Sequence, residues 1–396
     1  MNHNRLHFDS TARRFLRQRP AAAENFVNGW PHAVYFVSVT MRAGCLVGFF
    51  VTALIYSPSS LHAAQPEETL LEEINRLPEA ERQARLVSGA KKEGSVTWYV
   101  AMNRAYAQDL INAFQAEYPF LKVNALTASG GGLLSRVLTE HRAKSYQYDL
   151  FNTRSTTINV LKKADAIMRY RTPYRRFLRD GFYDKEGFFN GMFATPMVFI
   201  FNTKLVSRKE APASIEELAS SKWTGKLGMD NESYDWLAAV LDYYGEEKGT
   251  ELAARIGNQK LNVRRGPTLL TQLVAAGEFP VQIDGHHHEA IGKKKSGAPV
   301  DYNFPQPFVP VKSLIPIYMS SRPPHPHAAA LLADFLLGKK GQEIMYGHGR
   351  WVSHKNITPK GPDDIGDRKV VIPSPEKWGD RYQELIALYN KLLLRQ

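Results

Sequence analysis

The chain has 396 residues, of which 43% are hydrophobic and 23% charged, so it is long enough to bury more than one hydrophobic core. Its formal net charge is +12 at pH 7, but it contains no dense lysine and arginine block with interleaved aromatic residues, which argues against a nucleic-acid partner. A basic surface of this kind favours an anionic ligand or simply keeps a protein soluble.

The region from residue 41 to residue 64 is typical of an export signal. Arg42 supplies a positive charge, an apolar run extends from Cys45 to Tyr56, and small residues follow at Ala63 and Ala64. The apolar run is shorter than the roughly 20 residues that a membrane-spanning helix needs. We therefore expect cleavage near Ala63 and Ala64 and export to the periplasm. The alternative is an N-terminal anchor or a buried helix.

Residues 1–40 fit neither a signal nor a packed domain, and we interpret them as a disordered upstream extension with the true start at Met41. Removing residues 1–64, which carry six arginines and two acidic residues, leaves a formal charge of +8. It also removes Cys45, the only cysteine, so the mature chain can form no disulfide and has no thiol chemistry.

The first part of the mature chain alternates between helix and strand patterns. Apolar spacing predicts helices over 70–92 (punctuated at Pro78), 105–118, 133–143 and 156–164, and β-rich runs predict strands over 95–101, 121–127 and 148–153. Such alternation predicts βαβ units and a parallel sheet with helices on both faces.

The alternation resumes after a long extended run over 192–206, which is interrupted by Pro196. The patterns predict helices over 215–220, 236–244, 249–256, 268–276, 327–337 and 382–393, strands over 226–229 and 279–283, and a further extended run over 313–319. The sequence shows no internal repeat and no low-complexity segment.

Six stretches carry a family resemblance. They are LVSGAKKEGSVTWYV (86–100), TASGGGLLSRVLTEHRAKSYQYDLF (127–151), TPMVFIFNTKLV (195–206), SSKWTGKLGM (220–229), AAGEFPVQID (275–284) and HAAALLADFLLGKKGQEIM (327–345). In this order and spacing they resemble the type II periplasmic binding proteins of ABC transporters, in particular the ferric-iron-type subgroup of the family 1 extracellular solute-binding proteins.

The resemblance implies an α/β fold with two lobes. Each lobe would be a mixed, mostly parallel sheet flanked by helices, and two hinge strands would join the lobes around a ligand cleft. We expect the first lobe over 65–199, the second over 200–313, and the return to the first lobe with the C-terminal helix over 314–396. The resemblance also implies two partners at the inner membrane, a permease and its ATPase.

Three predicted loops of the first lobe follow strands and are candidates for ligand contact, because open α/β sheets bind ligands at the carboxyl ends of their strands. The glycines of the second loop permit close backbone approach, and the helix that follows offers free N–H groups to an anion. The alternatives are a tight turn and a solvated turn. The candidate residues are Asn103 in the first loop, Ser129, Gly130 and Gly131 in the second, and Thr153, Arg154 and Ser155 in the third.

Candidates in the second lobe include Tyr234 and Asp235, which follow its first strand and could line the cleft or belong to the core. Asp284 lies two positions before three consecutive histidines, His286, His287 and His288, at the end of another predicted strand.

In the resembling family an adjacent tyrosine pair ligates ferric iron at this place, and here the match falls approximately on His287 and His288. The family's histidine near the end of strand one is replaced by Met102 and Asn103. Imidazole suits Zn, Cu, Ni or Fe(II) better than Fe(III). Neighbours on an extended segment point to opposite sides, so at most two of the three histidines would face one metal. The alternatives are an organic or anionic ligand and an exposed polar loop.

Two classes of function are compatible with these features. The first is the binding component of an ABC importer, a monomer without catalytic residues or an obligatory cofactor. It would capture iron or another transition metal, or its anion complex, as cargo; an organic or phosphorylated anion is the alternative. The second is an exported metal-dependent hydrolase that uses residues 286–288. The sequence contains no Gly-x-Ser-x-Gly elbow and no dinucleotide fingerprint, which favours the binding protein.

Overall fold

The computed structural model describes residues 66–357, 365 and 368–394. The expected export signal, its cleavage site and the upstream extension lie outside these residues. Among the described residues, no helix combines the length and the apolar character needed to cross a membrane.

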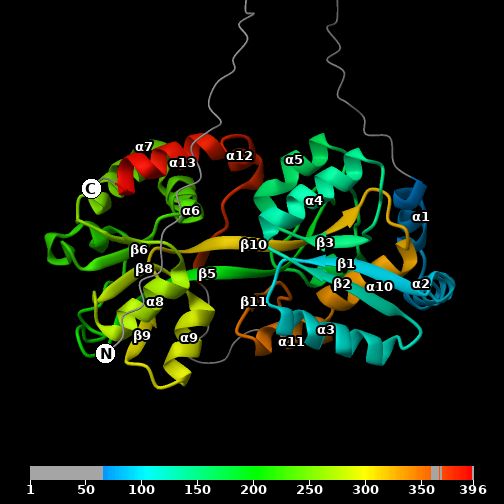
Figure 1. Ribbon diagram of the computed structural model, residues 1–396, viewed down its shortest axis with the longest axis horizontal. Coiled ribbons are helices and arrows are strands. Elements are labelled where there is room, and N and C mark those ends of the chain that lie inside the picture. The colour runs from blue at the N-terminus through cyan, green and yellow to red at the C-terminus, as the bar shows by residue number, and fades with distance from the viewer. Residues whose placement is uncertain (1–65, 358–364, 366–367, 395–396) are drawn as a thin grey trace, which may run out of the picture. The chain divides into compact units, whose positions relative to one another are not determined.

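The first lobe is built on three parallel strands, with β1 between β2 and β3 (Figure 1). Asn103 caps the helix after β1 by accepting the Ala105 N–H, and Ser129 caps the helix after β2 by accepting the Gly132 N–H. The elements of this lobe are α1 Pro66–Asn75, α2 Glu79–Glu93, β1 Ser95–Val100, α3 Arg104–Glu117, β2 Lys122–Thr127, α4 Gly130–Arg142, β3 Leu150–Asn152, η1 Ser155–Thr157, α5 Ile158–Lys163, β4 Ile167–Met168, η2 Pro173–Phe177, α10 Pro326–Leu337, α11 Lys339–Gly347 and β11 Trp351–Val352.

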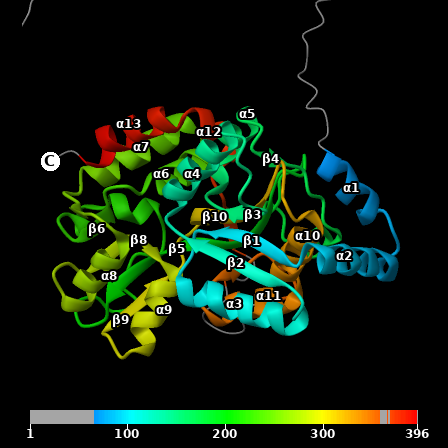
Figure 2. The ribbon, with the colours of Figure 1, turned by 45° about the vertical axis from the view of Figure 1, so that its right-hand side comes forward.

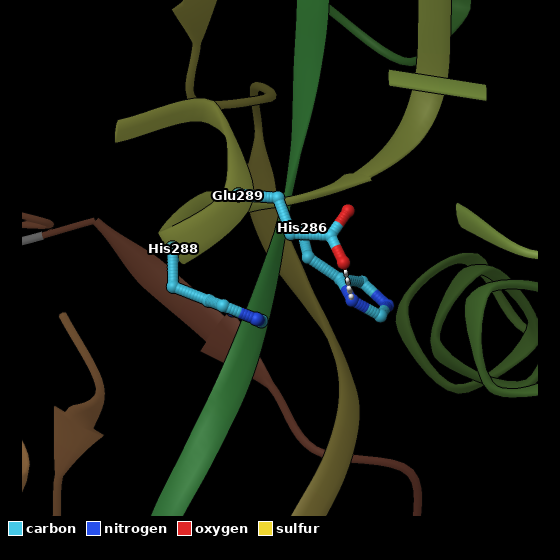
Figure 3. Close-up of side chains that lie close together, drawn as sticks. All are labelled: His286, His288 and Glu289. Carbon is cyan, nitrogen blue, oxygen red and sulfur yellow. Dashed lines mark ion pairs between the residues drawn. The ribbon is translucent and has the colours of Figure 1, made fainter. Parts of the chain in front are cut away.

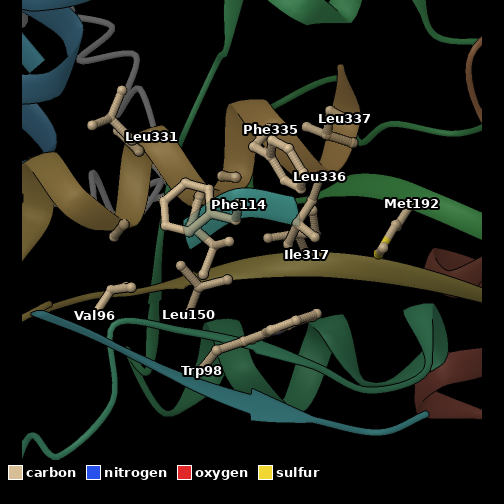
Figure 4. Close-up of a cluster of buried hydrophobic side chains, with 14 of the residues drawn as sticks. Val96, Trp98, Phe114, Leu150, Met192, Ile317, Leu331, Phe335, Leu336 and Leu337 are labelled. Carbon is tan, nitrogen blue, oxygen red and sulfur yellow. The ribbon is translucent and has the colours of Figure 1, made fainter. Parts of the chain in front are cut away.

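One core of the first lobe lies between this sheet and the helices α2, α3 and α10 (Figure 4). Trp98 of β1 is fully buried, and its indole N–H donates to Asn152 Oδ1 at 2.6 Å, which satisfies a polar group that would be costly to bury alone. Phe114 of α3 packs edge-on against Phe335 of α10. A fully buried side chain of this kind contributes about 1.5–3 kcal/mol to stability.

The second lobe has a smaller sheet in which β6 lies parallel to both β7 and β8, while β8 and β9 run antiparallel to β5. Figure 2 shows its helices α8 and α9 on the opposite side of the sheet from α6 and α7. The elements are η3 Glu216–Ala219, η4 Ser221–Trp223, β6 Leu227–Asp230, α6 Tyr234–Tyr244, α7 Glu246–Gly257, β7 Asn262–Arg264, α8 Pro267–Ala276, β8 Val281–His286, α9 His287–Lys295 and β9 Val300–Asn303.

Two long antiparallel strands, β5 Asn190–Asn202 and β10 Phe308–Ser320, run through both lobes. The N-terminal half of β5 packs in the first lobe, and its C-terminal half pairs with β8 and β9 of the second. Along that half, successive side chains enter opposite cores: Phe199 faces one and Ile200 the other. The two-lobed α/β class expected from the sequence is confirmed, and the expected boundaries fall inside or next to these two strands.

The C-terminal segment contains β12 Lys369–Val371, α12 Pro375–Asp380 and α13 Tyr382–Leu393. Strand β12 runs parallel to residues Phe308–Pro310 of β10. The apolar face of α13, with Leu385, Tyr389 and Leu392, joins the core of the second lobe against α6 and α7. Within residues 314–396, α10 and α11 thus pack in the first lobe, whereas the C-terminal helix α13 packs on the second.

Candidate functional site

Three side chains converge where β8 ends and α9 begins: His286, His288 and Glu289, here called the imidazole–carboxylate cluster (Figure 3). Each offers one ligand atom, and these atoms lie within 4.8 Å of one another. Figure 3 shows the ring of His288 approaching from one side while the Glu289 carboxylate lies beside the ring of His286. All three residues are half-buried. The set has the size and composition of a metal-ligand group.

The start of α9 decides which histidines meet. His286 is the last residue of β8 and His287 is the first residue of α9, and at this junction the ligand atoms of His286, His288 and Glu289 come together. His287 instead packs against the rings of Tyr302 and Phe304, with ring centroids 5.0 and 4.8 Å away. Of the three histidines named as candidates, His287 therefore lies outside the imidazole–carboxylate cluster.

Hydrogen bonds and charge fix the ionisation of the cluster. Thr268 Oγ1 of α8 donates to Glu289 Oε1 at 2.6 Å, and His286 Nδ1 lies 3.7 Å from the same oxygen. Burial alone would raise the pKa of Glu289, but its interactions with His286 and Thr268 lower that pKa to about 2. Glu289 is therefore a carboxylate at neutral pH.

Arg350, which lies between α11 and β11, contacts the cluster from the first lobe. Its Nη1 donates to Nδ1 of His288 at 3.2 Å. Burial and this guanidinium together lower the pKa of His288 to about 3, so the imidazole is neutral at physiological pH. A guanidinium can only donate, so Nδ1 of His288 must accept this hydrogen bond. A metal at Nδ1 would occupy the accepting lone pair, and a metal at Nε2 would leave the ring proton on Nδ1. Metal binding through either nitrogen would therefore displace the hydrogen bond.

A cavity of about 420 Å³ lies next to the cluster and is lined by both lobes. From the second lobe it receives residues of α9, including His288 and Lys295; from the first it receives Tyr106 and the segment with His348 and Arg350. His348 stacks on Tyr106 at 4.0 Å and contacts Asp109 Oδ2 through Nε2 at 3.0 Å. A cation needs far less space, since one water molecule occupies about 30 Å³ in the liquid. The cavity has room for a small organic anion, and its lining is basic.

The predicted loops of the first lobe lie at the carboxyl ends of its strands, and their polar groups are occupied in holding the turns. Asn103 and Ser129 cap helices, and Thr153 Oγ1 donates to the carbonyl oxygen of Gly130 at 3.1 Å. Gly131 has open space around it. No hydrogen bond or ion pair joins these turns to the imidazole–carboxylate cluster among the described residues.

The other candidates form a separate group at the hinge. Arg154 and Ser155 of the first lobe line a cavity of about 10 Å³ together with Asp235 of α6 and Lys312 of β10. Asp235 is only 5% exposed. Burial raises its pKa to about 6, against the attraction of Arg154 and Lys312. The space that these side chains enclose is large enough for about one water molecule.

Two further candidates serve the architecture of the second lobe. Tyr234 packs edge-on against Tyr382 and Tyr389 of α13. The carboxylate of Asp284 is buried and accepts the Asp230 N–H at 3.0 Å, and burial raises its pKa. Sequence reasoning found the histidines but missed Glu289, which directly follows them, and also Thr268, Lys295 and Arg350, which no motif marks.

The chain belongs to the family of bacterial extracellular solute-binding proteins, whose sequence profile matches residues 145–368, more than half of the chain. The resemblance to type II periplasmic solute-binding proteins is thereby confirmed. No curated protein matches the chain.

Several solved structures share the fold. Iron-bound HitA from Pseudomonas aeruginosa has a TM-score of 0.63 at 19% identity and covers 75% of this chain and 99% of its own. Trichodesmium IdiA (FutA), in complex with iron and citrate, has a TM-score of 0.64 at 18% identity and covers 76% and 99%. AfuA from Actinobacillus pleuropneumoniae, with fructose-6-phosphate bound, has a TM-score of 0.61 at 18% identity and the same coverage. At these identities the likeness establishes the fold alone.

Proposed function

We propose that this chain is the periplasmic binding component of an ABC importer and that it captures a divalent transition-metal ion, alone or with a small anion, at the imidazole–carboxylate cluster. The observation that carries the proposal is the convergence of two imidazoles and one carboxylate within 4.8 Å. The Nε2 atom of His286 is buried without a hydrogen-bond partner, and an incoming metal ion would satisfy it.

The donor atoms indicate which metals fit. Two imidazoles and a carboxylate suit Fe(II), Zn and similar divalent ions, whereas Fe(III) prefers hard oxygen ligands such as phenolate. The positions that match the tyrosine pair of the resembling family carry His287 and His288. We therefore propose a divalent ion as the cargo, in place of the ferric iron that the resemblance alone would imply.

Arg350 connects metal capture to an anion. A metal that takes His288 releases the guanidinium from this imidazole, and the released charge lies at the wall of the cavity with Lys295. An accompanying carboxylate or phosphate could then pair with both cations. The 420 Å³ cavity supports this accessory anion, because an ion alone would leave most of the volume unused.

Capture requires no chemical step. The imidazole–carboxylate cluster belongs to the second lobe and Arg350 to the first, so a solute that contacts both favours the conformation in which the lobes are close. We propose that the loaded protein acts as a monomer and passes its cargo to a permease, which is driven by an ATPase at the inner membrane.

Calorimetric titration with Zn²⁺, and with Fe²⁺ in the absence of oxygen, tests the proposal. We expect His288→Ala and Glu289→Gln each to weaken binding at least about 100-fold, since each removes one ligand. His287→Phe is the matched control: it keeps a ring against Tyr302 and Phe304 and should change affinity little. Unchanged affinity in His288→Ala and Glu289→Gln would exclude the metal site.

The cavity also supports a second candidate, a small organic or phosphorylated anion bound without metal. Thermal denaturation of the metal-free protein with citrate, inorganic phosphate or a sugar phosphate separates the two. A solute at 100 times its Kd stabilises the folded state by about 2.7 kcal/mol. A large stabilisation by one anion in metal-free protein, abolished by Arg350→Ala, would favour this candidate. Stabilisation that needs the metal would favour the first.

A further inference from the structure

The C-terminal segment makes a third connection between the lobes, besides β5 and β10. Figure 1 and Figure 2 both show α12 between α13, on the second lobe, and α5, on the first. Helix α12 contacts α5 and η1 in the first lobe, while the strand before it, β12, pairs with the half of β10 that lies in the second. We call β12, α12 and Arg381 (Lys369–Arg381) the C-terminal clasp.

The clasp is firmly attached to the second lobe. Trp378 is buried in the core of that lobe, and its indole N–H donates to Asp242 Oδ2 at 2.9 Å. Lys377 Nζ donates to the other oxygen of Asp242, also at 2.9 Å. Arg381 makes two hydrogen bonds to Glu246, at 2.7 and 3.1 Å. A buried aromatic ring and paired charges thus anchor this end of the clasp to the second lobe.

Helix α12 of the clasp packs closely on α5 and η1 of the first lobe, while the ion pair at this contact is exposed. Lys163 of α5 pairs with Asp380 at 2.8 Å, but the two side chains are 70% and 58% exposed. A Cβ atom added at Gly379 would lie 3.0 Å from Asn159 Nδ2 and 3.3 Å from the carbonyl oxygen of Thr156, so the helix touches the first lobe without a side chain between them. Exposed pairs of this kind are weak and can break and re-form.

Arg154 adds a second contact at the same edge. From the first lobe it lines the small hinge cavity with Asp235 and with Ile372 and Pro373 of the clasp. Burial raises the pKa of Tyr382, the first residue of α13, and the charge of Arg154 opposes this rise. The first lobe therefore offers two cations, Lys163 and Arg154, to acidic and polar groups held by the second.

The clasp and the cavity beside the imidazole–carboxylate cluster lie on opposite edges of the hinge. In Figure 1, α12 and α5 lie along the upper edge, whereas α9, α3 and α11, which carry or flank the cavity lining, lie along the lower edge. We propose that the C-terminal clasp restrains the lobes on its own edge, so that they separate mainly on the edge of the cavity. This inference does not depend on which solute the protein binds.

Distances between spin labels in the ligand-free protein test the clasp. Exposed Ala116 of α3 and Gln272 of α8 are replaced by labelled cysteines, in a background where Cys45 is replaced by serine. In the double variant Arg154→Ala/Lys163→Ala we expect the distance distribution to broaden toward longer distances.

The matched control is Arg142→Ala/Lys162→Ala. This control also removes one arginine and one lysine. In the parent, however, Lys162 pairs with Glu186 and Arg142 donates to the Leu138 carbonyl oxygen, and both contacts lie inside the first lobe. Its distance distribution should equal that of the parent. Gly379→Val, which wedges the clasp off the first lobe, should broaden the distribution as the double variant does. If both clasp variants fold, by circular dichroism, and retain the parent distribution, the clasp does not restrain the lobes.

Because the distances are measured without solute, a failure of the metal proposal would leave this result intact, and the reverse also holds. Metal titration of His288→Ala reports on the imidazole–carboxylate cluster, and label distances in Arg154→Ala/Lys163→Ala report on the clasp. The two proposals therefore stand or fall separately.

Discussion

The charge of Asp235 should destabilise the folded protein at neutral pH. Burial raises the pKa of this carboxyl from 3.8 to about 6, even though Arg154 and Lys312 act in the opposite direction. Each tenfold change in proton affinity corresponds to about 1.4 kcal/mol, so ionised Asp235 costs about 3 kcal/mol at pH 8. The folded state holds the proton more tightly than the unfolded state, so stability falls as pH rises from about 4 to about 6 and then levels off.

The neutral variant Asp235→Asn should remove this cost. We expect it to be more stable than the parent by up to about 3 kcal/mol at pH 8, and we expect the gain to disappear near pH 4, where the parent carboxyl is protonated. Urea denaturation followed by tryptophan fluorescence at a series of pH values measures both quantities.

The control is the exposed Glu232, which lies three positions before Asp235 in the sequence and 3.8 Å from Arg265. Glu232→Gln should change stability by less than about 0.5 kcal/mol at every pH. A difference between Asp235→Asn and the parent that is the same at pH 4 and pH 8 would refute the reasoning, because it would arise from packing and not from charge.

Two ion pairs of the first lobe give further predictions. Asp334 is buried and accepts from Arg82 at 2.6 Å. Asp334→Ala should therefore cost about 3–5 kcal/mol in urea denaturation, whereas Arg82→Met/Asp334→Leu should recover most of that loss; equal losses in the two variants would contradict this. A hydrogen bond to Asp149 raises the pKa of His325. His325→Gln should thus cost more at pH 5.5 than at pH 9, since the pair loses its charge as pH rises, and a cost independent of pH would count against it.

Strong periodicity made several helices predictable. The helix expected over 105–118 is α3 at Arg104–Glu117, and the one expected over 382–393 is α13 at its full length. Weak periodicity explains the errors. Helix α9 has Ala290 and Ile291 as its only apolar residues, so its sequence resembled a polar turn. The helix expected over 215–220 is only the short 3₁₀ turn Glu216–Ala219.

The candidate site was predictable only in part. A run of histidines after a strand can be read from the sequence, but the sequence does not show that Glu289 and Thr268 join them. Arg350 is 62 positions from His288 along the chain and is brought to it by the packing of the lobes. No local pattern could reveal it. The sequence also left open which lobe the C-terminal helix packs on. An amphipathic pattern shows that one face of a helix is buried, but it does not show against which lobe.

The approach of α13 to α7 depends on one residue without a side chain. A Cβ atom at Gly257 would lie 1.9 Å from the carbonyl oxygen of Leu392, closer than any two such atoms can come. Main chain here rests directly on main chain, so even alanine would force the last helix outward. The missing methyl group at position 257 thus sets the distance between α7 and the last turn of α13.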